Sequence, residues 1–330
     1  MADVMHNFEL FQPDTVEDAL ALLYEHGKDA WVIAGGKDSL DWFKDRVKMP
    51  PVLVDVSGIK GLSGIREEDG GGLWIGAMTT LTEVTENSLV MEKYPALAAA
   101  AARVASPQIR NVGTIGGNLS QDTRCHYYRD GYPCYRAEGN TCYANTPTAM
   151  NREHTLFEAS RCVAVTPSDT APVTVVLDAE MVIQNDDGER SVKAEDFFVG
   201  PDIDITRMTV LQPGDLLLGM RIPSTWAGAS QYFEKVADRN VWDFPLVNVA
   251  MAAKMDGGVI SDVRMACGAV QCTPRRLSEV EDLIKGETPG EEIETLVTRV
   301  AASGAKPLNY NHYKAPLMAN LAKRAVRSLA

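Results

Sequence analysis

Apolar positions in the first part of the chain recur at helical and strand spacings in turn. The segment from Asp14 to Gly27 predicts a helix, because its leucines recur at helical spacing and it ends on a glycine. Thr15 and Asp18 have the spacing of a capping box at its start. The elements expected next are the strands WVIAGG, PVLVDVS and LWIGAMTT and an alanine-rich helix from Pro95 to Val104. Helices and strands that alternate in this way favour a small α/β unit.

Regular periodicity is lost between Gly113 and Asp169. A stretch of about fifty residues without a repeating pattern is unusual inside a compact chain. Four of the six cysteines lie in this stretch, and a metal centre can order a segment that buries little apolar surface. We therefore expect a metal-binding insert from about residue 121 to residue 165.

Helix and strand patterns return after the insert. The elements expected there are a helix in DTAPVTVVLDA, a hairpin in MVIQNDDGERSV, a strand in LLLGMRIP, a strand around Tyr232 to Val236, a hairpin that turns at Asp256 to Gly258, and helices over Pro274–Lys285, Gly290–Ser303 and His312–Leu329. The character of the chain changes near Ser224 to Gly228. This change predicts one domain over residues 1–224, made of a small α/β subdomain (about 1–58) and a second subdomain (59–224). A second domain over residues 225–330 would combine a three-stranded sheet with helices.

Composition and charge narrow the classes of function. Hydrophobic residues make up 45% of the chain and charged residues 23%, which is typical of a globular protein. The net charge of −13 argues against nucleic acid as a partner. No apolar run is long enough for a membrane helix, and the opening residues lack the pattern of a signal peptide. We therefore expect a cytoplasmic protein, exported only if a partner subunit carries the signal.

Two glycine turns, AGGKDSL (Ala34 to Leu40) and GTIGGNL (Gly113 to Leu119), are candidate ligand-binding loops. Paired glycines let the backbone adopt positive φ, and they let a ligand approach the amide groups without a Cβ in the way. Consecutive amides in such a turn favour an anion such as a diphosphate. Neither turn has the GxGxxG pattern of a nicotinamide-binding fold. A single glycine pair is more often only a tight turn, but two in one chain favour binding.

The cysteines Cys125, Cys134, Cys142 and Cys162 are separated by 8, 7 and 19 residues. Four thiolates are the usual ligand set of a [4Fe–4S] cluster. They also suit structural zinc, although zinc ligands normally come in pairs two to four residues apart. Spacing alone therefore leaves a cluster, zinc and no metal as alternatives. We expect Cys267 and Cys272, which stand apart, to be buried thiols without a metal.

Several motifs in the chain resemble, in the same order, those of the flavoprotein subunits of molybdenum hydroxylases, the family of xanthine dehydrogenase. These motifs are VIAGGKDSL, IRNVGTIGGNL, TPSD at Thr166 to Asp169, LLLGMRIP and YFEKVADR around Lys235. The resemblance covers essentially the whole chain. It implies an α+β fold, in which a two-subdomain FAD-binding domain of the vanillyl-alcohol-oxidase type precedes a small domain of sheet and helices.

The resemblance also implies a set of FAD-binding residues. The residues that match the family motifs are Ile33, Ala34, Gly35, Gly36, Lys37, Asp38, Ser39, Leu40, Gly113, Thr114, Gly116, Gly117, Asn118, Gln121, Asp169, Leu217 and Lys235. In this set Asp169 would contact the sugar or ribityl part of the flavin, and Leu217 and Lys235 would flank the isoalloxazine ring. Lys37 stands where the family more often has threonine or asparagine.

The cysteine insert resembles that of two branches of the family. Most members run almost directly from GGNL into the SD motif, whereas 4-hydroxybenzoyl-CoA reductase and certain bacterial aldehyde oxidoreductases carry a [4Fe–4S] cluster in an insert here. This likeness implies that Cys125, Cys134, Cys142 and Cys162 bind such a cluster. The segment QDTRC resembles both branches. The long gap before Cys162 looks more like the aldehyde oxidoreductases, whereas WDFPLVNVA (Trp242 to Ala250) resembles the reductase, so the choice between them stays open. We expect the nearby His126, Tyr127, Tyr128 and His154 to pack around the cluster without binding it.

No Ser/His/Asp arrangement, HExxH motif or molybdopterin signature occurs in the chain, so no catalytic residue is assigned. The resemblance implies an electron-transfer subunit, with a large molybdopterin-binding subunit and a small [2Fe–2S] subunit as partners and a ferredoxin or NAD(P) as an external acceptor or donor. The substrate of such a complex would be an aldehyde, an aromatic CoA thioester or an N-heterocycle. The alternatives are a stand-alone flavin oxidoreductase and a zinc-stabilised scaffold without catalytic function.

Overall fold

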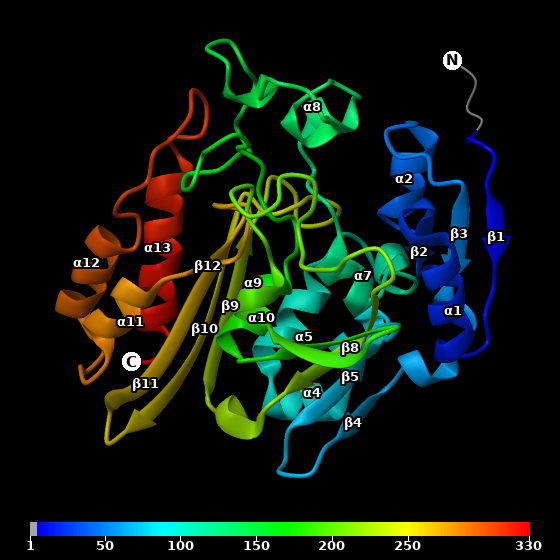
Figure 1. Cartoon of the computed structure of the whole chain (residues 1–330). Coiled ribbons are helices and arrows are strands. Elements are labelled where there is room, and N and C mark those ends of the chain that lie inside the picture. The colour runs from blue at the N-terminus through cyan, green and yellow to red at the C-terminus, as the bar shows by residue number, and fades with distance from the viewer. Residues whose placement is uncertain (1–4) are drawn as a thin grey trace.

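The computed structural model describes residues 5–330 and arranges their strands in three sheets. In Figure 1 the first sheet lies at the right, the second lies near the centre, and the third, with the last three helices, lies at the left. A long irregular segment containing α8 (His126–Arg129) crosses the top of this view.

The first sheet is parallel, with strand order β1-β3-β2. Its elements are β1 (Glu9–Phe11), α1 (Val16–His26), β2 (Ala30–Ile33), α2 (Ser39–Lys44) and β3 (Val52–Asp55). The expected cap of α1 is confirmed, because the Thr15 hydroxyl accepts a hydrogen bond from the Asp18 amide at 3.1 Å. Strand β2 runs directly into the first glycine turn, so this sheet positions that turn.

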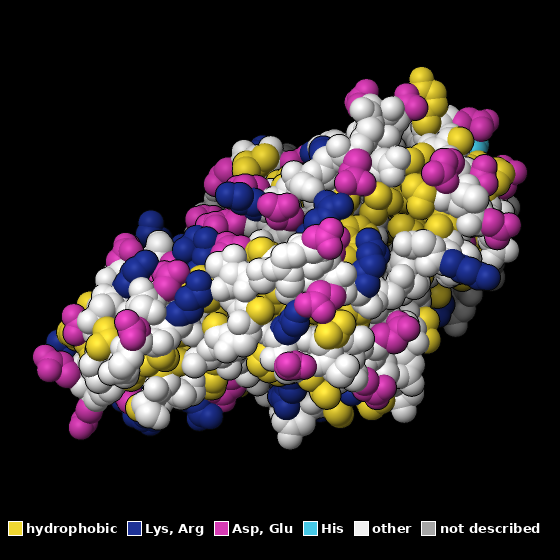
Figure 2. Space-filling model, turned by 90° about the horizontal axis from the view of Figure 1, so that it is seen from below, with side chains coloured by type: hydrophobic (Ala, Val, Ile, Leu, Met, Phe, Trp, Pro, Cys, Tyr) yellow, Lys and Arg dark blue, Asp and Glu magenta, His cyan; other side chains and the backbone are white. Residues whose placement is uncertain are grey.

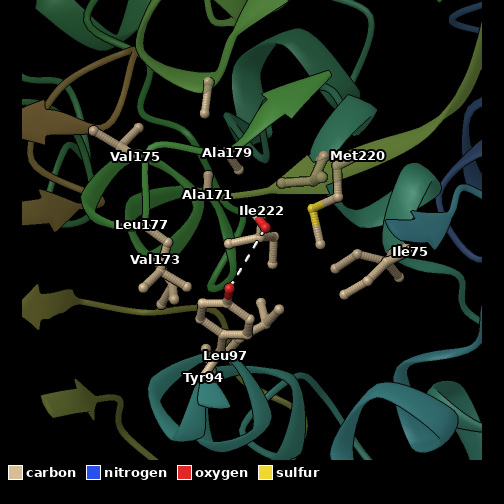
Figure 3. Close-up of a cluster of buried hydrophobic side chains, with 14 of the residues drawn as sticks. Ile75, Tyr94, Leu97, Ala171, Val173, Val175, Leu177, Ala179, Met220 and Ile222 are labelled. Carbon is tan, nitrogen blue, oxygen red and sulfur yellow. Dashed lines mark hydrogen bonds between the residues drawn. The ribbon is translucent and has the colours of Figure 1, made fainter. Parts of the chain in front are cut away.

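The second sheet has five strands in the order β4-β5-β8-β6-β7, all paired antiparallel. The strands are β4 (Ile65–Glu67), β5 (Leu73–Gly76), β6 (Glu180–Asn185), β7 (Gly188–Lys193) and β8 (Leu216–Ile222). The helices beside them are α3 (Leu81–Glu86), α4 (Ser88–Lys93), α5 (Pro95–Ala102), α6 (Pro107–Arg110), α7 (Ile115–Ser120), α9 (Ala171–Val176) and α10 (Ala194–Phe197). Figure 3 shows the core between them, where the Tyr94 hydroxyl donates to backbone carbonyl groups at the end of β8. Such apolar packing holds the helix that carries the second glycine turn against the sheet.

The third sheet is antiparallel and has the order β12-β11-β10-β9. Its strands are β9 (Ser230–Val236), β10 (Val247–Asp256), β11 (Val259–Gly268) and β12 (Arg275–Arg276), and its helices are α11 (Ser278–Ile284), α12 (Glu291–Val300) and α13 (Lys314–Arg327). The expected hairpin is confirmed, with its turn at Gly257 and Gly258. The expectation of three strands was wrong, because Arg275 and Arg276, which we had placed in a helix, pair with β11 as a fourth strand.

The irregular segment expected between the second glycine turn and the TPSD motif is confirmed. Over residues 121–165 the described structure contains only α8 and two single turns, Tyr135–Ala137 and Tyr143–Asn145. The helix expected after TPSD is shorter than its pattern suggested. It begins only at Ala171, where the Ser168 hydroxyl accepts from the Ala171 amide at 3.1 Å.

Charges of both signs occur on the surface, and the helices are short. Within residues 5–330, no helix is both long enough and apolar enough to cross a bilayer. On the face shown in Figure 2, acidic and basic side chains are interspersed, and no continuous basic patch covers it. The net charge of −13 agrees with this distribution.

Candidate functional site

A cavity with a volume of about 730 Å³ lies between the first sheet, helix α7 and the start of β8. Its volume is within the range of pockets that hold cofactors and other small molecules. Both glycine turns form part of its wall. The structure therefore brings together two motifs that are more than seventy residues apart in the sequence.

Most of the residues expected to bind FAD line this cavity. They are Ala34, Gly35, Gly36, Lys37, Asp38, Ser39, Leu40, Gly113, Thr114, Gly116, Gly117, Asn118, Gln121 and Leu217. The other three, Ile33, Asp169 and Lys235, are not among the lining residues.

The first glycine turn is shaped by close contact with the second. A Cβ added to Gly35 would lie 2.0 Å from the carbonyl oxygen of Val112, so no larger residue fits there. Gly36 has a φ of 68°, which favours glycine. After the turn, the hydroxyl of Ser39 accepts a hydrogen bond from the indole of Trp31 at 2.9 Å. The turn is thus a rigid surface with backbone exposed to the cavity.

The second glycine turn is the start of α7. The Thr114 hydroxyl accepts a hydrogen bond from the Gly117 amide at 3.1 Å. Gly116 packs so closely against Ala77 that an added Cβ would lie 2.7 Å from the Ala77 Cβ. The Asn118 side-chain oxygen accepts from the hydroxyls of Ser168 and Thr170, at 2.7 and 2.6 Å. These contacts fix the GGN segment against both β5 and the TPSD loop.

Asp169 and Lys235 form a buried ion pair behind the cavity. The Lys235 ammonium group donates to Asp169 Oδ2 at 2.6 Å and to the carbonyl oxygens of Arg103 and Asp243. Asn248 donates to the second oxygen of Asp169 at 3.0 Å. These hydrogen bonds join the TPSD loop to β9 and β10. Neither Asp169 nor Lys235 is among the residues that line the cavity, so their expected contacts with the flavin stay a prediction.

A second and much smaller pocket, of about 10 Å³, is lined by all four cysteines of the insert. Cys134 and Cys162 are buried, Cys125 and Cys142 are partly buried, and all four are free thiols. The described residues include no group of three His, Cys, Asp or Glu side chains close enough to hold a single metal ion. Cys267 and Cys272 do not line this pocket and are buried, as expected.

The surroundings of Cys125 and His154 favour the neutral forms of these two side chains. Burial raises the pKa of the Cys125 thiol to about 12, whereas a bound metal would favour the thiolate. Burial, together with His126 and Lys314, lowers the pKa of His154 to about 3, so that its ring is uncharged. His154 Nε2 lies 3.3 Å from the sulfur of Cys125. This histidine packs against the cysteines, as expected, and makes a polar contact with one of them.

A network of charged residues connects the cysteine insert to the first glycine turn. The Asp38 carboxylate, in that turn, accepts a hydrogen bond from the backbone amide of Asp122 at 3.0 Å and another from the Arg129 guanidinium at 2.6 Å. Asp122 in turn pairs with Lys48 and Arg136 at 2.6 and 2.7 Å. Burial alone would raise the pKa of Asp122, but Arg136 and Lys48 outweigh it and lower the pKa to about 2. The aspartate is therefore ionised and ties the two sites together.

Part of the cavity wall was not expected from the sequence. Two exposed aromatic residues of the loop after β9, Trp242 and Phe244, line the cavity, and the guanidinium of Arg124 lies 4.5 Å from the centre of the Phe244 ring. The segment from Thr206 to Leu216 also contributes to the wall. The aromatic residues in WDFPLVNVA were a usable signal for the first of these segments, whereas the second has no motif.

Comparison with known proteins identifies the family to which the chain belongs. Residues 6–225 match the family model described as the FAD binding domain in molybdopterin dehydrogenase, and residues 231–329 match the CO dehydrogenase flavoprotein C-terminal domain. The chain is 35% identical over 265 residues to the aldehyde oxidoreductase FAD-binding subunit PaoB of Escherichia coli (strain K12), covering 79% of this chain and 81% of PaoB. It is 28% identical over 325 residues to the carbon monoxide dehydrogenase medium chain of Hydrogenophaga pseudoflava, covering 97% and 96% of the two chains.

A solved structure gives the same result for the fold. Carbon monoxide dehydrogenase from Hydrogenophaga pseudoflava superposes with a TM-score of 0.78 at 27% identity, covering 98% of each chain. The protein is therefore a flavoprotein of the oxidoreductase class. It belongs to the family of FAD-binding subunits of the molybdenum hydroxylases. The expected fold, an FAD-binding domain followed by a domain of sheet and helices, is confirmed. The matched descriptions name FAD and do not name a group bound by cysteines.

Proposed function

We propose that this chain carries electrons between an FAD in the large cavity and a [4Fe–4S] cluster in the cysteine pocket. The observation that carries the proposal is that the two sites adjoin. Arg124 lines the large cavity, and the next residue, Cys125, lines the cysteine pocket. Consecutive Cα atoms are only about 3.8 Å apart. Bound groups in these two sites would therefore lie near each other within one chain.

The large cavity is suited to FAD because both glycine turns expose backbone to it. Gly35 and Gly116 lack space for a Cβ, because each packs closely against neighbouring protein atoms. The glycine pairs also let a ligand approach the backbone amides, and consecutive amides favour a diphosphate. Lys37 lines the same wall and could neutralise part of the negative charge of a diphosphate. We assign FAD contacts to the lining residues of the two turns and to Leu217. Ile33, Asp169 and Lys235 would act by supporting that wall.

The cysteine pocket is better suited to a cluster than to zinc. Four free thiols surround one small pocket, which matches the ligand set of a [4Fe–4S] cluster. Structural zinc needs its ligands around a single ion, and the described residues contain no such group. When bound, a cluster supplies one-electron transfer. The protein residues would hold it through the four sulfurs and shield it with Tyr128 and His154, which are buried.

The relatives suggest which partners and substrates the complex has. Their names include a medium chain of carbon monoxide dehydrogenase, an aldehyde oxidoreductase subunit and a nicotinate dehydrogenase subunit. We infer that this chain works beside a large molybdopterin-binding subunit, where an aldehyde, an aromatic CoA thioester or an N-heterocycle reacts. A small [2Fe–2S] subunit would exchange electrons with the flavin, and a ferredoxin or NAD(P) would be the external acceptor or donor.

The domain division that goes with this proposal separates the cofactor sites from the C-terminal domain. Residues 1–224 would form the FAD-binding domain, with subdomains over about 1–58 and 59–224 and the cluster-binding insert over about 121–165. Residues 225–330 would form the second domain. Support comes from the two family models, which match residues 6–225 and 231–329.

Iron, zinc and flavin analysis of the anaerobically purified chain tests the proposal. We expect about four iron atoms and about one FAD per chain. Cys134→Ala should lose the iron and keep the FAD, whereas the matched control Cys267→Ala, at a buried cysteine outside the pocket, should keep both. Zinc in place of iron, or a wild-type chain without either metal, would contradict the cluster and leave the flavoprotein intact.

A further inference from the structure

Arg136 is a buried cation in the wall of the cysteine pocket. It lies in the turn Tyr135–Ala137, between the second and third cysteines of the insert, and only 4% of its surface is exposed. One of its nitrogens, Nη2, donates to Asp122 at 2.7 Å. The other two, Nε and Nη1, are buried and have no hydrogen-bond partner within the described residues.

A guanidinium with two unpaired nitrogens is costly to bury. Leaving a buried donor without an acceptor costs about 1–3 kcal/mol, and more for a charged group. Native proteins therefore seldom leave such groups unpaired without a ligand, an ion or a functional reason. The two nitrogens call for an acceptor that the described side chains do not supply.

The charges around Arg136 do not balance. Asp122 is shared between Arg136 and Lys48, so two cations face one carboxylate. The residues that line the cysteine pocket include Arg136 and Arg161 but no aspartate or glutamate. One buried positive charge is thus left to be compensated, and it lies in the wall of the pocket that holds the four thiols. This environment is suited to an anionic occupant.

We propose that Arg136 is a positioning residue for the iron–sulfur cluster, an inference that rests on the proposed function. Its free N–H groups would donate to the cluster or to its cysteine sulfurs, and its charge would favour the reduced, more negative state. Hydrogen bonds to the sulfurs and the net charge nearby are among the factors that set the potential of such clusters. Through Asp122, whose amide donates to Asp38 at 3.0 Å, the same arginine is also connected to the first glycine turn.

Arg161 provides a matched comparison. It lines the same pocket, but its side chain is exposed, so water screens its charge. A buried charge acts on the cluster with little screening by water. Removing the charge of Arg136 should therefore change the reduction potential of the cluster much more than removing the charge of Arg161. Neither residue contributes a sulfur ligand, so both substitutions leave the ligand set unchanged.

The test is an EPR-monitored redox titration of the anaerobically purified full chain. We expect Arg136→Gln to make one-electron reduction of the cluster at least tenfold less favourable, a shift of about 59 mV to lower potential. Arg161→Gln should produce a much smaller shift. Equal shifts in the two variants, or no shift in Arg136→Gln, would overturn the inference.

A second variant covers the case in which Arg136→Gln does not retain the cluster. Asp122→Asn keeps the shape of the side chain but removes the carboxylate charge beside Arg136, so the potential should rise. A fall or no change in this variant would overturn the inference. FAD content and the melting temperature, measured alongside, separate a change in potential from unfolding. A wild-type chain without iron would instead contradict the proposed function itself.

Discussion

At the scale of single residues, Gly35 is the point at which the two glycine turns in the wall of the large cavity approach each other. Its Cα faces the backbone of Val112 so closely that a Cβ would lie 2.0 Å from the carbonyl oxygen. Backbone cannot rotate away as a flexible side chain can. The distance between the two glycine turns therefore depends on the absence of a side chain at this position.

Gly35→Ala should separate the two turns and weaken FAD binding. Overpacking of this kind costs about 1–3 kcal/mol, and we expect the purified variant to carry less FAD and to melt at a lower temperature. The control is Gly61→Ala, because a Cβ at Gly61 would meet nothing within 4 Å. Full FAD content and an unchanged melting temperature in Gly35→Ala would contradict the described contact.

The ion pair of Asp169 and Lys235 leads to a second prediction at this scale. Removing one partner of a buried pair typically costs about 3–5 kcal/mol, because the other charge is left without compensation. Asp169→Asn should therefore lower the free energy of unfolding by about this amount, measured by chemical denaturation. Asp45→Asn, at an exposed position on the surface, should have little effect. Equal stability of the two variants would show that the pair does not hold the C-terminal domain to the TPSD loop.

At the scale of elements, the cysteine insert differs from the rest of the chain. Over residues 121–165 it contains one four-residue helix and two single turns, so few backbone hydrogen bonds of regular structure hold it together. Its connections to the first glycine turn are hydrogen bonds and ion pairs through Asp38 and Asp122. A bound cluster would add four covalent links across this segment.

Removing the metal should loosen the insert selectively. Metal binding contributes to folding where a segment buries little apolar surface, so we expect faster amide hydrogen exchange over residues 125–162 after iron is removed by chelation. Exchange in β10 and β11, the central strands of the third sheet, should stay unchanged and serves as the internal control. Unchanged exchange in the insert would contradict a structural role for the metal.

The sequence predicted elements better where local chemistry determines them. The cap at Thr15, the hairpin at Gly257 and Gly258 and the shape of the glycine turns follow from residue types at short spacing. Strand β12 was missed because its two residues pair with β11 across the sheet, and such pairing has no local signal. The helix after TPSD was overestimated, because Ser168 and Asp169 are engaged by residues distant in sequence.

At the scale of the whole molecule, the large cavity is built from segments far apart in the chain. The two glycine turns could be identified from the sequence, and the structure places both in its wall. The contribution of Thr206 to Leu216 could not, because this segment has no motif and its place depends on how the sheets and loops meet (Figure 1). Trp242 and Phe244 were missed although the aromatic residues of their segment were a usable signal. The unpaired nitrogens of Arg136 likewise become visible only when the pocket is seen in three dimensions.

The central claim, that one chain carries both a flavin and a cluster, is tested most directly by counting electrons. In an anaerobic reductive titration followed by visible absorbance, the wild-type chain should take up about three electrons, about two for the flavin and about one for the cluster. Cys142→Ala should take up about two, with only the flavin absorbance bleached. Uptake of about two electrons by the wild type, equal to that of the variant, would contradict the account.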